Sequence, residues 1–256
     1  MKNVIITSAT RTAVGSLNRS LKNVQGYELG SAVIKESVLR SQIKNEDVDE
    51  VIFGQVLTGG TGQNPARQAA IHSGIPKEKP AHIVNQVCGS GIRSVASGFQ
   101  SIKSGDSNII IAGGQESMSL APHAIHLRDG KKLGDTTLTD TMIKDGLWDA
   151  FHGYHMGITA ENVAEKFQVT REEQDKFALK SQEKALKAQK ENKFNTEIVN
   201  YKIKSKKAEI NFNKDEHPRE GINLEALKRL KPFLTSLLII SWIKVTRILV
   251  PEAPIG

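Results

Sequence analysis

The first 118 residues alternate between short apolar runs and longer segments with helical features. The apolar runs have the length of strands and are rich in β-branched residues. They predict buried strands at residues 3–9, 50–56, 81–87 and 108–114, the last buried on both faces. Helices are predicted between them, over residues 28–43, over residues 64–74 and directly after residue 88. This alternation predicts an α/β domain with a largely parallel sheet covered by helices.

The three predicted helices rest on different signals. The second has Asn64 as N-cap, Pro65 at its first position and Gly74 as its stop. The other two are predicted from apolar residues that share one face. In the first helix these are Leu29, Ala32, Val33 and Leu39. In the third they are Ile92, Val95, Ala96, Phe99 and Ile102.

The pattern changes after residue 118, which divides the chain into three predicted segments. Residues 1–118 form the α/β domain, and residues 119–231 are more polar and predict an inserted domain. Two helices are expected in the insertion, one after Thr159 and one after Thr170, where Thr170 and Glu173 form a capping box. Residues 232–256 are apolar and β-branched, but their uncharged run ends at Lys244 and is too short to span a membrane.

Composition narrows the classes of partner and location. The net charge of +7 is compatible with an anionic partner, but no RNP-like aromatic motif accompanies it, so no nucleic-acid partner is expected. The beginning of the chain does not resemble a signal peptide, which favours a cytoplasmic location. The single cysteine excludes an internal disulfide and a multi-cysteine metal site, and the histidines form no H-x-x-x-H pattern. No metal is therefore expected.

The single cysteine, Cys88, stands where a predicted strand stops and a helix starts. Backbone N–H groups converge at a helix start, and the helix dipole adds partial positive charge, which favours the thiolate form of a cysteine. Gly89 and Gly91 allow a tight turn and the close approach of a substrate. These features favour a nucleophile for covalent acyl transfer. The alternative is a buried, inert cysteine that packs under the sheet.

Several segments together resemble the thiolase family. They are "NQVCGSGIRSV", "VIITSATRTAVGSLNRSLKN", "GQVLTGGTGQNPARQAA", "IIAGGQESMS", "YHMGITAENVAEKFQVTREEQDKFALKSQEKALKA" and "PREGINLEALKRLKP". The resemblance covers about residues 1–232. It implies a thiolase-like N-terminal domain, with a mixed, mostly parallel sheet covered by helices and an inserted loop domain that covers coenzyme A.

The resemblance also implies a reaction and residue roles. The "GYHMG" motif resembles the short-chain type, which condenses two acetyl-CoA molecules to acetoacetyl-CoA and CoA, or catalyses the reverse. Cys88 would carry the acetyl group, and His155 and Met156 would bind substrate near the thioester and pantetheine. Arg219 would approach the nucleotide end of CoA. For His155 and Arg219 the alternatives are a hydrogen-bonded loop histidine and a solvated surface arginine. CoA thioesters are then substrates, no cofactor is expected, and the family implies a homo-oligomer, a dimer or a tetramer.

The pattern of the family breaks in the last segment. Thiolases take an N-E-A-F loop, a G-H-P histidine and a C-x-G cysteine from a second catalytic domain, and none of these motifs occurs here. Residues 232–256 replace the expected continuation, which predicts a truncated thiolase of low or no condensing activity. A catalytically dead CoA-binding or dimer-forming remnant is the alternative. A ketoacyl synthase is a third, but "YHMGITAEN" argues against it.

Overall fold

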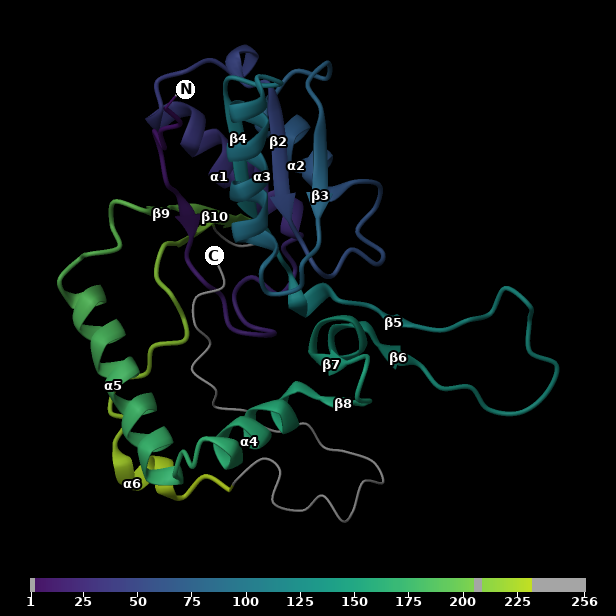
Figure 1. Cartoon of the computed structure of the whole chain (residues 1–256), viewed down its shortest axis with the longest axis vertical. Coiled ribbons are helices and arrows are strands. Elements are labelled where there is room, and N and C mark those ends of the chain that lie inside the picture. The colour runs from purple at the N-terminus through teal and green to yellow at the C-terminus, as the bar shows by residue number, and fades with distance from the viewer. Residues whose placement is uncertain (1–2, 205–208, 232–256) are drawn as a thin grey trace. The chain divides into compact units, whose positions relative to one another are not determined.

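A computed structural model describes residues 3–204 and 209–231 of the chain (Figure 1). The described residues divide into two compact units. The first unit contains residues 3–146, 195–204 and 209–216, and the second contains residues 147–194 and 217–231. The predicted apolar tail, 232–256, lies outside the described residues.

The first unit contains a three-stranded parallel sheet in the order β3-β2-β4. The strands are β2 (Glu50–Gly54), β3 (Ala81–Val84) and β4 (Ile110–Gly114), which confirms three of the four predicted strands. Because the strands are parallel, Gly54, Val84 and Gly114 lie in register at the same carboxyl edge. Strand β4 is half-buried along its whole length, so the prediction that it is buried on both faces is wrong.

The predicted strand at residues 3–9 does not form among the described residues. Ile5 and Ile6 are 76% and 81% exposed, and only Arg11–Thr12 form a short strand, β1, parallel to β9 (Ile198–Val199). Side-chain contacts are present here instead: the Thr7 hydroxyl hydrogen-bonds to the Ser41 hydroxyl at 2.8 Å, and directly after the segment the Thr10 hydroxyl donates to the carbonyl of Val33. A strand requires a neighbouring strand to receive its backbone hydrogen bonds, and an apolar run alone does not specify one.

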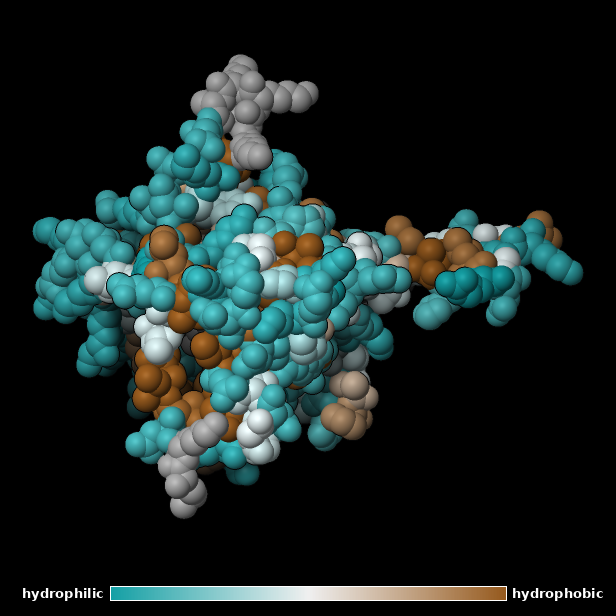
Figure 2. Space-filling model, turned by 90° about the horizontal axis from the view of Figure 1, so that it is seen from above, coloured by the Kyte–Doolittle hydropathy of each residue, from teal (hydrophilic) through white to brown (hydrophobic). Residues whose placement is uncertain are grey.

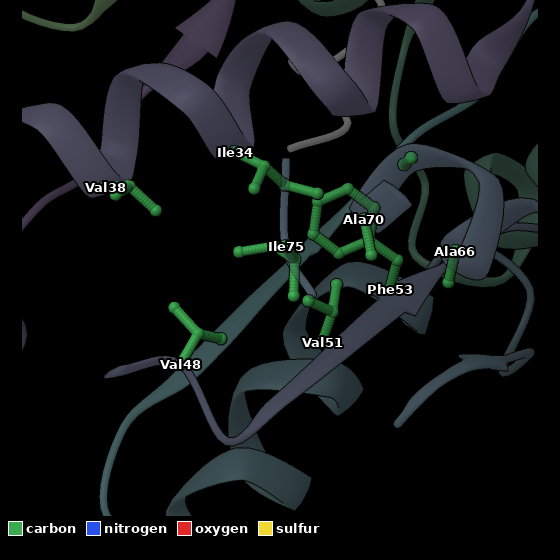
Figure 3. Close-up of a cluster of buried hydrophobic side chains, with 9 residues drawn as sticks. Ile34, Val38, Val48, Val51, Phe53, Ala66, Ala70 and Ile75 are labelled. Atoms are coloured by element: carbon green, nitrogen blue, oxygen red, sulfur yellow. The ribbon is translucent and has the colours of Figure 1, made fainter. Parts of the chain in front are cut away.

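Helices α1 (Gly26–Arg40) and α2 (Pro65–Ser73) cover one face of the sheet and enclose its main core (Figures 1 and 3). The Asn64 side chain accepts from the N–H of Arg67 and Gly74 ends the helix at φ +99°, which confirms the predicted caps of α2. In α1 the predicted face is wrong at Leu39, which is 70% exposed. The core residues are Ile34, Val38, Val48, Val51, Phe53, Ala66, Ala69, Ala70 and Ile75.

Helix α3 (Ser90–Ser104) lies on the opposite face of the sheet, in front of β2 and β4 in Figure 1. Its packed face consists of small residues, because Ser90, Ser94 and Gly98 are the buried ones. Its predicted apolar face points outward, with Ile92 71% and Phe99 49% exposed. The apolar spacing therefore predicts the helix correctly, but it does not identify the face that packs.

The rest of the first unit consists of short elements. Strands β5 (His123–Ala124) and β6 (Thr139–Asp140) pair antiparallel and carry an extended arm, residues 125–138. Figure 2 shows brown apolar side chains on this arm, which contains exposed leucines at 127, 133 and 138. Strands β10 (Tyr201–Lys204) and β11 (Glu209–Phe212) form a second antiparallel pair. Short helical turns span Asn45–Asp47, Met118–Leu120 and Met142–Leu147.

The second unit is mostly helical. Its elements are β7 (Trp148–Asp149), β8 (Tyr154–His155), α4 (Met156–Lys166), α5 (Arg171–Lys190) and α6 (Leu224–Lys228). The capping box of Thr170 and Glu173 forms as predicted, whereas α4 begins before Thr159. The Arg171 guanidinium donates to the Leu227 carbonyl at 2.9 Å and thereby holds α6 against α5. Across the described ranges, no helix combines the length and the apolar character needed to cross a membrane.

Candidate active site

Cys88 lies in the turn between the end of β3 and the beginning of α3, at the carboxyl edge of the sheet. Its side chain is exposed. The alternative of an inert cysteine buried under the sheet is therefore wrong. An exposed thiol directly before a helix of fifteen residues has both access to a substrate and the favourable end of the helix dipole.

The turn around Cys88 is closed by the side chain of Ser90. The Ser90 hydroxyl accepts from the N–H of Gln86 at 2.9 Å and donates to the carbonyl of Val87 at 2.6 Å. The N–H of Gly89 also donates to the Gln86 carbonyl, at 3.0 Å. Cys88 is thus the central residue of a five-residue turn whose two ends are tied together.

The turn contains one strained residue. Val87 has φ +50°, a left-handed conformation that Asn and Gly adopt readily and β-branched residues avoid. Six non-glycine residues in the described chain have positive φ, and Val87 is the β-branched one among them. Such a conformation costs about 1–3 kcal/mol and persists only where neighbouring interactions enforce it.

Two glycines at the strand ends allow the first turn of α3 to approach the sheet. A Cβ atom on Gly54 would lie 2.4 Å from the Ser90 carbonyl carbon and 2.6 Å from the Gly91 nitrogen. A Cβ atom on Gly114 would lie 3.5 Å from the Gly91 Cα. The Cys88 turn is therefore positioned by direct contact with bare backbone at the end of β2.

The first turn of α3 also provides N–H groups. The N–H of Arg93 donates to the Gly89 carbonyl at 2.9 Å. The N–H groups of Gly91 and Ile92 have no acceptor among residues 3–204 and 209–231. Donors at this position, next to a nucleophile, can stabilise an oxyanion that forms on an attacked carbonyl.

A buried polar network lies at the same edge of the sheet, and the sequence analysis missed it. The Gln115 side-chain amide donates to the Gln55 side-chain carbonyl at 2.9 Å, and the Gln55 amide donates to the Leu57 carbonyl at 3.0 Å. The Glu116 carboxylate accepts from the N–H of Val56 at 2.8 Å. Burial raises the pKa of Glu116, and its backbone hydrogen bonds oppose this only in part. The feature of the sequence that could have indicated this network is the polar Gln-Glu pair directly after the apolar strand β4.

His155 and Met156 lie in the second unit, at the beginning of α4. His155 is the N-cap of this helix, and its Nδ1 accepts from the N–H of Gly157 at 3.0 Å. Nδ1 is therefore unprotonated, and in the neutral ring the proton lies on Nε2. Burial lowers the pKa of His155, which favours this neutral form. The adjacent Met156 side chain is 42% exposed.

Arg219 lies on an exposed loop of the second unit, where its backbone N–H donates to the Gln182 side chain at 2.9 Å. The predicted site is thus divided, with Cys88 on the first unit and His155, Met156 and Arg219 on the second. The roles predicted for the four residues stay predictions. Within the described ranges, no group of three or more His, Cys, Asp or Glu side chains could hold a metal ion.

Comparison with known proteins identifies the family. The sequence profile of the thiolase N-terminal domain matches residues 4–236. The chain belongs to the thiolase family. It is 56% identical to the acetyl-CoA acetyltransferase of Rhizobium meliloti (strain 1021) over 229 residues, which are 90% of this chain and 58% of that protein.

Two further relatives agree with this assignment. The cytosolic acetyl-CoA acetyltransferase of Rattus norvegicus is 53% identical over 230 residues, 90% of this chain and 58% of that protein. The crystal structure of the Bacillus anthracis acetyl-CoA acetyltransferase matches with a TM-score of 0.88 at 40% identity, over 91% of this chain and 59% of that chain. The chain thus has the thiolase fold and spans somewhat more than half the length of the relatives that it matches.

Proposed function

We propose that Cys88 accepts the acetyl group of acetyl-CoA, in the first half-reaction of an acetyl-CoA C-acetyltransferase. The observation that carries the proposal is the exposed Cys88 thiol, held in a closed turn directly before α3. The named activity of the relatives supports a CoA thioester as the substrate. The proposal includes CoA thioesters as substrates and no additional cofactor.

The proposed step is a thioester exchange. The Cys88 thiolate attacks the carbonyl carbon of acetyl-CoA, and the resulting tetrahedral intermediate breaks its bond to the CoA sulfur. The CoA thiolate leaves and takes up a proton, so the products are acetyl-Cys88 and CoA. The N–H groups at the beginning of α3 would stabilise the oxyanion, and the loss of one such donor typically costs about 10²–10³-fold in rate.

The second half-reaction transfers the acetyl group to the α-carbon of another acetyl-CoA, forms acetoacetyl-CoA and regenerates the thiol. It requires a base for the α-proton, a contribution of about 10²–10⁴-fold. The 256 residues contain one cysteine and no G-H-P histidine, so the bases that thiolases use are not in this sequence. We therefore propose the acetyl transfer to Cys88 as the step that these 256 residues support.

The second unit supplies the proposed binding residues for CoA. His155 and Met156 would line the pocket near the thioester and pantetheine, and Arg219 would approach the nucleotide end. The half-buried position of His155 supports a polar contact of this kind. Its Nδ1 accepts from the N–H of Gly157, so this nitrogen is already engaged within the chain.

Radiolabelled acetyl-CoA tests the proposal. We expect one acetyl group on the peptide that contains Cys88, release of CoA in equal amount, and no label on a Cys88→Ala variant that unfolds at the same urea concentration. Acetoacetyl-CoA formation would show that these residues also complete the second half-reaction. The absence of label on the wild-type chain, with CoA still bound in a calorimetric titration, would replace the proposal by a catalytically dead CoA-binding remnant.

The proposed partners include further copies of this chain, as a dimer or tetramer. The exposed leucines of the arm at residues 125–138 support an apolar contact between copies. The proposal includes no nucleic acid and no membrane. We also propose a cytoplasmic location, which the rat relative's description as cytosolic supports. Sedimentation velocity tests the proposed association into dimers or tetramers, and a single monomeric species at all concentrations would contradict it.

A further inference from the structure

The hydroxyl of Ser90 is placed to control the conformation of the Cys88 turn. It receives the N–H of Gln86 and donates to the carbonyl of Val87, so it joins the residues on both sides of Cys88. Ser90 is 4% exposed, which shields these bonds from competing water. Together they close the turn at its base and leave Cys88 at its exposed tip.

The strain at Val87 gives these bonds a specific purpose. A valine at φ +50° relaxes toward negative φ unless its neighbours prevent it, and such a rotation would swing the next residue away from the start of α3. The Ser90 hydroxyl holds the peptide group that follows Val87, through the Val87 carbonyl, and it also holds the N–H of Gln86 one residue earlier. The peptide group before Val87 is held separately, because the N–H of Val87 donates to the Asn85 side chain at 2.9 Å and the Gln86 carbonyl accepts from Gly89. The Val87 carbonyl also accepts from the backbone N–H of Ser90 at 3.1 Å, so removing the hydroxyl takes away one of its two donors and weakens the restraint on this rotation.

We propose that Ser90 is a positioning residue for Cys88, which holds the thiol at the beginning of α3 by locking Val87 in its left-handed conformation. The proposal rests on the acetyl transfer proposed above and adds to it a residue that touches neither substrate nor thiol. Ser90 acts through the backbone of the turn.

The helix itself contains a matched control. Ser94 is also fully buried in α3, and its single hydroxyl proton lies between two carbonyls, those of Gly91 and Gly113, at oxygen–oxygen distances of 2.6 and 2.7 Å. The contact with Gly113 connects the helix to β4, the contact with Gly91 lies within the helix, and neither involves residues 86–88. Ser90→Ala and Ser94→Ala therefore remove the same group with similar burial, but only the first releases the turn.

Two measurements distinguish positioning from a general loss of structure. The first is the rate of Cys88 acetylation by acetyl-CoA divided by its rate of alkylation by iodoacetamide, a small reagent that reports an accessible thiol. We expect this ratio to fall about 10–100-fold in Ser90→Ala and less than about threefold in Ser94→Ala, since misplacement by about 1 Å costs up to 10²-fold. The second is hydrogen exchange of the Gln86 amide, which should accelerate in Ser90→Ala alone.

A second substitution isolates the strain. Asparagine adopts the left-handed region readily, so Val87→Asn should restore much of the acetylation ratio in the Ser90→Ala background. Equal ratios in Ser90→Ala and Ser94→Ala, or no recovery with Val87→Asn, would overturn the positioning role. If the wild-type chain takes no acetyl group, the proposed function fails. In that case, hydrogen exchange of the Gln86 amide still tests whether Ser90 holds the turn. Equal protection of this amide in Ser90→Ala and Ser94→Ala would reject the positioning role of Ser90.

Discussion

The contact between Gly54 and the first turn of α3 leads to a quantitative prediction for Gly54→Ala. The new Cβ atom would lie 2.4 Å from the Ser90 carbonyl carbon and 2.6 Å from both the Ser90 oxygen and the Gly91 nitrogen. Ordinary contact begins at 3.4 Å, so the helix end and the strand must separate by about 1 Å. All three atoms belong to the backbone, which leaves no flexible side chain to move aside.

The displacement affects stability and chemistry in different proportions. Overpacking of this kind costs about 1–3 kcal/mol of the free energy of unfolding. A shift of about 1 Å at a nucleophile costs up to 10²-fold in rate. We therefore expect Gly54→Ala to remain folded at low urea and to acetylate Cys88 about 100-fold more slowly than the wild type.

Gly113→Ala is the matched control for this experiment. Gly113 lies opposite Phe53 on the adjacent strand, and its Cβ atom would lie 3.5 Å from the Phe53 ring, an ordinary contact. Its acetylation rate should stay within about threefold of the wild type, the range of a benign substitution. The assay is single-turnover acetylation by acetyl-CoA, followed on the Cys88 peptide, with urea unfolding of each variant. If Gly54→Ala matches Gly113→Ala in both measurements, the contact does not position the turn.

Three further predictions concern charged groups. Asp215→Ala should lower the free energy of unfolding by about 2–3 kcal/mol in urea titrations, because Asp215 is largely buried and pairs with Arg11 at 2.8 Å. Lys202→Ala, which removes an exposed ion pair, should change the free energy of unfolding by less than about 1 kcal/mol. Equal effects of the two substitutions would refute this prediction. The folded chain binds the Glu116 proton more tightly than the unfolded chain, so the free energy of unfolding should fall as pH rises from 4.5 through the raised pKa of Glu116. Glu116→Gln should reduce the dependence of the free energy of unfolding on pH in this range. An unchanged pH dependence would contradict the raised pKa of Glu116. The pKa of His155 is lowered, so its contribution to stability should be present above pH 6.5 and be lost as pH falls through 6.5 toward the folded value. A midpoint below 6.5 in its NMR titration checks this, and one at or above 6.5 rejects it.

The sequence predicts most of the sheet and the helix caps because these depend on local chemistry. Strands β2, β3 and β4 follow from β-branched runs, and the ends of α2 follow from Asn64 and Gly74. Cys88 is predicted at the correct turn for the same reason, since a strand, a Gly-Ser-Gly sequence and a helix follow one another there.

The failures concern what each element packs against. Apolar spacing predicts that α3 is a helix, but the sheet packs against its small residues, so Ile92 and Phe99 are exposed. The strand at residues 3–9 fails because its partner is not specified by its own sequence. Glu116 is missed because a carboxylate after a strand suggests a surface loop until its backbone donors, Val56 and Leu57, are known.

The small packed face of α3 also limits which substitutions the chain can accumulate. Ser90, Ser94 and Gly98 are the residues of the helix that are buried against the sheet, and a Cβ atom on Gly98 would already lie 3.1 Å from the Ile110 side chain. These three positions therefore tolerate only small residues, although none of them carries an apolar side chain of the usual core type. In a mutational scan they would rank with the core, and a hydropathy profile of the same helix would rank them with the surface.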